Sequence, residues 1–143
     1  MPYEYRGDIA HADIAFDAWG KTIEDVFQEA AKATMQVMVE DLSAVRHLET
    51  MELQLDQENE EMLLFDFLNE LIFYKDARRL ILLPTQLTVT KTGDGCSVQA
   101  TLEGEEIDRE RHQLNTDVKA VTMLRFSLGE VPEGWRATVV VDV

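Results

Sequence analysis

Near the start of the chain, hydrophobic and polar residues alternate with a period of two, which is the pattern of a β-strand with one buried face. This strand ends at Gly20, and Thr22 followed by Asp25 has the form of a helix capping box. Apolar residues at helical spacing then predict an amphipathic helix that reaches about Glu40. The strand carries Ala12, Ile14, Phe16 and Ala18 on its predicted buried face, and Asp13, Asp17 and Trp19 on the other.

The same two periods continue through the middle of the chain. Residues 47–56 alternate again, with Met51, Leu53 and Leu55 on one face, and predict a second strand. Residues 57–76 predict a second helix, whose first turn is acidic, as the helix dipole favours. Apolar residues cover most of its circumference, which indicates a helix in the core or at an interface.

From Pro84 onward the pattern predicts only strands. Gly93-Asp94-Gly95 separates residues 87–92 from residues 96–102 and predicts a hairpin. Residues 104–115 are charged and predict a surface excursion. Strands over 118–128 and 135–143 follow, the first with Thr122, Leu124, Phe126 and Leu128 on one face. This order predicts a single α+β domain over residues 1–143, with two helices packed on a mostly antiparallel sheet.

The net charge of the chain limits the classes of partner that we expect it to bind. Its 28 Asp and Glu residues exceed its 13 Lys and Arg residues, for a net charge of −15. Such a chain is repelled by phosphate backbones, so we do not expect direct nucleic-acid binding. The acidity favours a basic protein partner or a bound cation, and solubility alone explains it equally well.

Cysteine content and hydropathy suggest the compartment. Cys96 is the only cysteine, so no disulfide framework or thiolate metal cluster is expected. The N-terminal residues lack the basic and apolar pattern of a secretory signal, and no apolar run is long enough to span a membrane. We therefore expect a cytoplasmic protein.

Two aspartates form the first candidate site. Asp13 belongs to the first strand, and Asp142 ends the last one beside Val143. If these strands are neighbours, both side chains and the terminal carboxylate of Val143 converge on one hard cation, for which Ca²⁺ or Mg²⁺ is suited. Spacing alone favours the alternative that both acids face water at strand edges, because paired acids are common in acidic chains.

Lys119 and His112 are two further candidates. Lys119 lies beside apolar strand positions, where it either balances the aspartates or reaches a phosphate group of a partner. The alternative is a lysine whose stem packs on the surface and whose ammonium group is solvated. His112 follows Glu105, Asp108 and Arg111, and is either a titrating or metal-binding group or simply solvated.

Motifs of known enzyme classes are absent from the sequence. It contains no glycine-rich phosphate loop, no His-Glu-x-x-His and no nucleophile-elbow serine. The sequence therefore does not predict an independent enzyme.

Taken in order, several segments of the chain resemble the archease family. The resemblance runs nearly end to end, and the Lys-Ala-Val-Thr segment and the closing Asp-Val are its most specific parts. The matching segments are Tyr3-Glu4-Tyr5, Ala12-Asp13-Ile14, Gly20-Lys21-Thr22, Leu68-Asn69-Glu70-Leu71, Gly104-Glu105, Asp108, Arg111-His112, Val118-Lys119-Ala120-Val121-Thr122 and Val141-Asp142-Val143.

This resemblance implies an archease-like α+β fold and a non-catalytic accessory role in RNA processing. Archeases act on the RtcB-type RNA ligase, which joins a 3′-phosphate or 2′,3′-cyclic phosphate end to a 5′-hydroxyl end. They promote guanylylation of the ligase and its multiple turnover. An alternative role is that of a chaperone-like adaptor for a tRNA methyltransferase.

The resemblance also implies roles for individual residues. The metal site of the family falls on Asp13, Asp142 and Val143, with Ca²⁺ expected ahead of Mg²⁺ or Mn²⁺. Lys119 matches a lysine that assists at the active site of the ligase. His112 belongs to a matching segment and is an accessory candidate.

Two positions depart from the family pattern. The family has His-Thr-Ala-Asp where this chain has Ala10-His11-Ala12-Asp13, so the histidine is displaced to the opposite face of a strand. Leu124 stands where a second histidine is common. Both departures leave the metal carboxylates intact but call a proton-transfer role into question.

Overall fold

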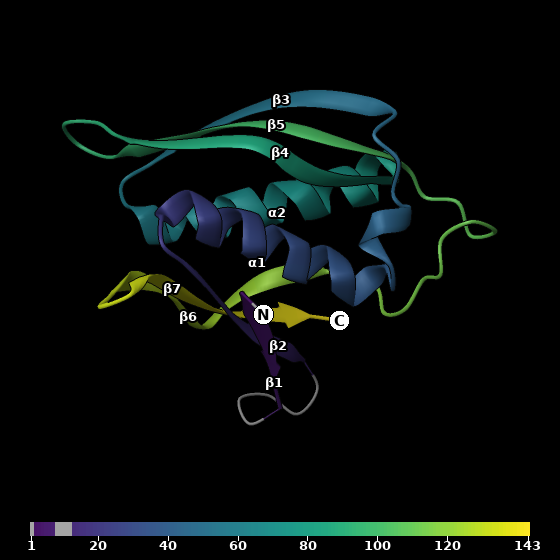
Figure 1. Ribbon diagram of the computed structural model, residues 1–143, viewed down its shortest axis with the longest axis horizontal. Coiled ribbons are helices and arrows are strands. Elements are labelled where there is room, and N and C mark those ends of the chain that lie inside the picture. Colours follow the sequence, from purple (N-terminus) through teal and green to yellow (C-terminus); the bar gives the residue numbers. More distant parts are fainter. Residues whose placement is uncertain (1, 8–12) are drawn as a thin grey trace.

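Two helices lie between two antiparallel sheets in the computed structural model, which describes residues 2–7 and 13–143 (Figure 1). The helices are α1 (Ile23–Met38) and α2 (Glu60–Arg78), and a short 3₁₀ helix, η1, spans Leu42–Ala44. The strands are β1 (Tyr3–Arg6), β2 (Ile14–Gly20), β3 (Glu49–Gln57), β4 (Leu80–Lys91), β5 (Cys96–Glu106), β6 (Ala120–Val131) and β7 (Gly134–Asp142).

The strands divide into two sheets rather than one. The first sheet has the order β1-β2-β7-β6 and the second has the order β3-β5-β4, and every pairing is antiparallel. The predicted α+β class and antiparallel pairing are therefore confirmed. The helices form the middle layer, so each is buried from both sides (Figure 1).

The start of α1 is fixed by the predicted capping box. The N–H of Asp25 donates to the hydroxyl oxygen of Thr22 over 3.1 Å, and the N–H of Thr22 donates to the carboxylate of Asp25 over 3.2 Å. These bonds satisfy donors that have no partner within a helix. The helix ends two residues before the predicted limit, because Val39 takes an extended conformation.

The second helix is the centre of the core, as its apolar circumference predicts. Phe67 is fully buried, and its ring centroid lies 5.5 Å from that of Phe27 in α1. The helix begins at Glu60, after Asn59 caps it by accepting from the N–H of Met62 over 2.9 Å. Its fully buried side chains reach both sheets and are Leu63, Leu64, Phe67, Leu68 and Leu71.

The hairpin predicted at residues 93–95 joins β4 to β5, and the N–H of Thr92 donates to the carbonyl of Gly95 over 2.8 Å.

The predicted start of β structure after Pro84 is wrong, because β4 begins at Leu80 and accommodates Pro84 at an irregularity in register. At Gly104 in β5, a Cβ atom would stand 1.7 Å from the carbonyl oxygen of Ile81. The two strands approach this closely only because residue 104 is glycine.

The predicted alternation in β6 fails at its middle. Pairing with β7 is irregular between Thr122 and Ser127, and Arg125 has a positive φ of 50°. Leu124 is consequently 51% exposed while Phe126 is 7% exposed, although the sequence places both on one face. A β-bulge changes the side-chain phase of a strand, which an uninterrupted period of two does not anticipate.

Side chains from the helices cap main-chain N–H groups of two strands that lie at sheet edges. Asn69 in α2 accepts from the N–H of Val121 in β6 over 3.0 Å, and Glu61 accepts from that of Leu128 over 3.2 Å. Glu24 in α1 accepts from the N–H of Val89 in β4 over 3.1 Å. Asn69, in the interior of α2, therefore satisfies a strand edge.

Within residues 2–7 and 13–143, none of the helices is long and apolar enough to cross a membrane.

Candidate functional site

The pairing of β2 with β7 ends one residue from each of the two predicted aspartates. Ile14 pairs with Val141, and Asp13 and Asp142 are the residues that adjoin this last pair. Both aspartates are half-buried. The condition on which the sequence hypothesis depended, that the two strands are neighbours, is therefore met.

Lys119 lies at the same end of this sheet. Its main-chain N–H donates to the carbonyl oxygen of Asp142 over 2.8 Å, and Ala120 pairs with Asp142 in the β6–β7 ladder. The side chain of Lys119 is exposed and forms no ion pair with any residue in the described part of the chain. We call the end formed by Asp13, Lys119, Asp142 and Val143 the sheet tip.

The donor chemistry of the sheet tip fits a hard divalent cation. The carboxylate side chains of Asp13 and Asp142 supply only oxygen ligands, which Ca²⁺ and Mg²⁺ prefer. Among residues 2–7 and 13–143, no group of three or more His, Cys, Asp and Glu side chains is arranged to hold a metal.

His112 lies in a buried ionic network rather than in a solvated loop. Its side chain is fully buried and that of Glu105 is 4% exposed. The N–H of Asp108 donates to Nδ1 of His112 over 3.0 Å, which places the ring proton on Nε2, 2.9 Å from the Glu105 carboxylate. Arg46 donates to the same carboxylate through its main chain and its side chain, and Arg111 is a further partner.

The network ionises Glu105. Burial alone raises the pKa of this carboxyl group, but hydrogen bonds donated by the Arg46 main chain, His112, the Arg46 side chain and Arg111 outweigh it and lower the pKa to about 2. The network joins the segment after η1 to the segment after β5. Both ring nitrogens of His112 are engaged inside the chain, so the expectation that this histidine is solvated is wrong.

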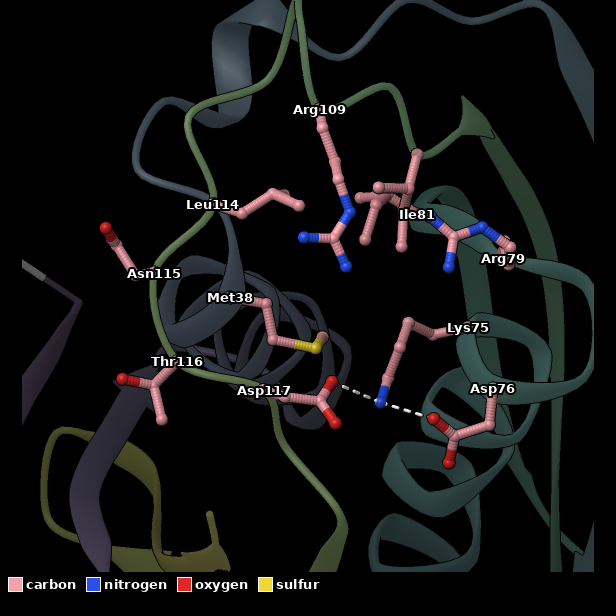
Figure 2. A pocket seen from close by; sticks show the side chains of 11 residues that line it. Met38, Lys75, Asp76, Arg79, Ile81, Arg109, Leu114, Asn115, Thr116 and Asp117 are labelled. Atoms are coloured by element: carbon pink, nitrogen blue, oxygen red, sulfur yellow. Dashed lines mark hydrogen bonds and ion pairs between the residues drawn. The ribbon is translucent and has the colours of Figure 1, made fainter.

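Lys75 is an organising residue that the sequence reasoning missed. It is 5% exposed, and its ammonium group donates to Asp117 over 2.7 Å, to the carbonyl of Val118 over 2.8 Å and to Asp76 (Figure 2). Burial lowers the pKa of Lys75, but the hydrogen bonds to the two carboxylates outweigh it and raise it, so the group stays charged. This contact anchors the segment that leads into Lys119.

A signal for Lys75 is present in the sequence. It follows Leu68 and Leu71 at the spacing of a single helix face, so helical periodicity places it on the buried side. The displaced histidine His11, with Ala10 and Ala12, lies outside the described residues.

Comparison with known proteins gives matches over nearly the whole chain. A model of the Archease protein family (MTH1598/TM1083) matches residues 3–143. The chain belongs to the archease family. Archease from Methanosarcina mazei is 35% identical over 143 residues, which cover 99% of this chain and 95% of that one. Archease from Pyrococcus abyssi is 32% identical over 133 residues, covering 92% and 93%.

Solved structures support the family fold. The solution structure of protein 1598 from Methanobacterium thermoautotrophicum aligns with a TM-score of 0.84 at 31% identity and covers 99% of both chains. A crystal structure from Thermotoga maritima, described as an archease and possible chaperone, aligns with a TM-score of 0.65 at 21% identity. It covers 96% of this chain and 97% of that one, and at this identity it supports the fold alone. The fold predicted from the archease resemblance is thus confirmed.

Proposed function

We propose that this protein is a non-catalytic activator of an RtcB-type RNA ligase in the cytoplasm, which promotes guanylylation of the ligase and its multiple turnover. The observation that carries the proposal is the pairing of β2 with β7, which ends one residue from Asp13 and Asp142, together with the main-chain bond from Lys119 to Asp142, in a chain of the archease family. An exposed tip with one lysine and two aspartates is suited to enter the active site of another protein.

The proposed tip holds a divalent cation, with Ca²⁺ preferred. Asp13, Asp142 and the carboxylate of Val143 are its ligands, and irregular coordination by oxygen atoms suits Ca²⁺ better than Mg²⁺. A bound cation supplies positive charge for phosphate oxygens. The aspartates orient the cation, and Lys119 presents its ammonium group beside it to a phosphate of the partner.

The overall charge supports docking on the ligase rather than on its RNA. A net charge of −15 repels RNA and is complementary to the basic surface of an RNA-binding enzyme. The cationic part of the tip would then be directed to the phosphates in the active site while the acidic surface contacts the protein.

The test compares guanylylation and multiple-turnover ligation by the cognate ligase with and without this protein. We expect the wild type to accelerate both reactions, and Asp13→Ala and Asp142→Ala to lose the acceleration while keeping the thermal stability of the wild type. Asp94→Ala, at the exposed turn between β4 and β5, is the matched control and should activate fully. Full activation by a folded Asp13→Ala protein would refute the proposal.

The adaptor alternative requires a different surface. Binding of a tRNA methyltransferase through residues 62–73 would need an apolar helix face that is open to solvent. This part of α2 lies between the two sheets, and Phe73 is its only large apolar side chain that is exposed, at 55%. The phrase possible chaperone belongs to the Thermotoga maritima protein, whose likeness is in fold. Co-purification of a methyltransferase without the ligase would favour the adaptor over the activator.

A further inference from the structure

A cavity of about 350 Å³ opens beside the C-terminal end of α2 (Figure 2). Its walls come from that helix end, from the segment that follows β5 and from residues 114–117. An apolar surface is contributed by Met38, Ile81, Ile107 and Leu114. The cavity therefore combines a small apolar surface with the charged side chains around its rim.

One wall of the cavity carries two carboxylates that share a single ammonium group. Asp76 and Asp117 both accept from the ammonium group of Lys75, which also donates to the carbonyl of Val118. All N–H donors of Lys75 are engaged in this way. Lys75 therefore organises the wall and offsets one of its two negative charges.

Two arginines that line the cavity, Arg79 and Arg109, form no ion pair with a carboxylate in the described part of the chain. Arg79 leaves the end of α2 and Arg109 leaves the segment after β5, and Figure 2 shows both guanidinium groups directed toward the cavity. In a chain with more than twice as many acids as bases, these two cations face the cavity, while its two aspartates, Asp76 and Asp117, pair with Lys75.

The backbone of Arg79 adds a second observation. Arg79 is the C-terminal cap of α2 and has a positive φ of 55°, a left-handed conformation that glycine adopts at lower free energy. A left-handed residue commonly ends a helix, and here it sets the direction in which the Arg79 side chain leaves α2. The carbonyl of Arg79 also accepts from the N–H of Ile107 over 2.7 Å, which fixes the two arginine-bearing walls relative to each other.

We propose that this cavity binds a small phosphate monoester, with the phosphate group between Arg79 and Arg109 and its organic part on the apolar surface. Guanidinium groups bind phosphate oxygens through paired N–H donors, and two of them balance a phosphate dianion. The volume is at the lower end of small-molecule sites, which suits one compact ligand. The site is separate from the sheet tip and does not depend on an RNA ligase.

Titration of isotope-labelled full-length protein with phenyl phosphate, inorganic phosphate and benzoate, followed by NMR, tests the site. We expect phenyl phosphate to shift the amide signals of Ile107 and Thr116 and to bind at least tenfold more tightly than the other two probes. Inorganic phosphate lacks the apolar part, and benzoate keeps the ring but offers a single carboxylate charge.

Three variants complete the experiment. Arg79→Gly removes the guanidinium group and relieves the backbone, so it remains folded, and we expect it and Arg109→Gln to weaken phenyl phosphate binding at least tenfold. Arg78→Gln is the matched control, because Arg78 is in the same helix turn but does not line the cavity. Absence of binding, equal affinity in the folded Arg79→Gly protein, or benzoate binding as tight as that of phenyl phosphate would each overturn the proposal.

Discussion

The main-chain N–H of Lys119 donates to the main-chain carbonyl of Asp142 over 2.8 Å, so the chain holds this lysine beside a proposed metal ligand without using either side chain. The Lys119 ammonium group and the Asp142 carboxylate both stay available for other partners. Binding of a cation and contact with a phosphate of the ligase are therefore separable by mutation.

Lys119→Ala should lower the acceleration of ligase guanylylation at least tenfold while leaving Ca²⁺ affinity nearly unchanged. The exposed side chain contributes little to stability, and the main-chain bond to Asp142 survives the substitution. Calorimetric Ca²⁺ titration and a guanylylation assay measure the two properties in parallel. Lys21→Ala, at another exposed lysine, is the control, and an unaltered acceleration with Lys119→Ala would exclude a direct role for this lysine.

Stability should fall in acid as Glu105 becomes protonated. The pKa of this carboxyl is about 2 in the folded protein against an ordinary value of 4.5. Because the folded pKa is the lower one, the stabilisation is complete above about pH 4.5 and is lost as the pH falls toward 2. Urea unfolding at a series of pH values between 6 and 2, on the order of half a unit apart, measures this loss.

Glu105→Gln tests the origin of that pH dependence. It removes the charge that Arg46, Arg111 and His112 share, and we expect a loss of about 2 kcal/mol in the free energy of unfolding at pH 7. The remaining pH dependence below 4.5 should then be shallower. Glu106→Gln, at the exposed neighbouring position, serves as the control, and an identical acid profile in Glu105→Gln and wild type would contradict the assignment.

Gly104→Ala should destabilise the protein by about 3 kcal/mol, because its Cβ would overlap the carbonyl of Ile81 in a ladder that cannot move apart cheaply. Gly129→Ala is a matched control in another strand, since a Cβ there meets no atom within 4 Å. Thermal and urea unfolding of both variants measure the difference. Equal stability of the two variants would show that β4 and β5 adjust without cost.

Lys75→Met should loosen the segment that leads to the sheet tip. The substitution leaves the carbonyl of Val118 and the carboxylate of Asp117 without their donor, at a cost of about 2 kcal/mol. Amide hydrogen exchange at Val118 and Lys119 should accelerate more than exchange in β7. Uniform acceleration along the chain would mean that the variant lowers only global stability.

The sequence predicts local elements of this fold well because local chemistry determines them. Thr22 and Asp25 are three residues apart and form the expected capping box, and the glycines at 93 and 95 enclose the expected turn. The neighbouring position of β2 and β7, on which the hypothesis about Asp13 and Asp142 depends, joins opposite ends of the chain. Strand patterns give the two ends of that pair, and the resemblance to archeases supplies the reason to join them.

Contacts between distant segments were not predictable in the same way. His112 and Glu105 are embedded in a charged stretch, and only the approach of Arg46, from a loop far earlier in the chain, makes their burial favourable. The predicted burial of Leu124 was wrong for another reason, because the irregularity near Arg125 changes which face of β6 each side chain occupies. Periodicity records neighbours along the chain and carries no information on which remote donor meets a buried acid.

The capping of β6 by Asn69 and Glu61, and of β4 by Glu24, has a consequence for assembly. A strand from another molecule that joined either sheet there would have to displace these side chains from the N–H groups they occupy. The helices of the middle layer thus hinder the addition of further strands to the edge strands β4 and β6. Recognition by a larger enzyme at these edge strands must then proceed through side chains and not through shared β-structure.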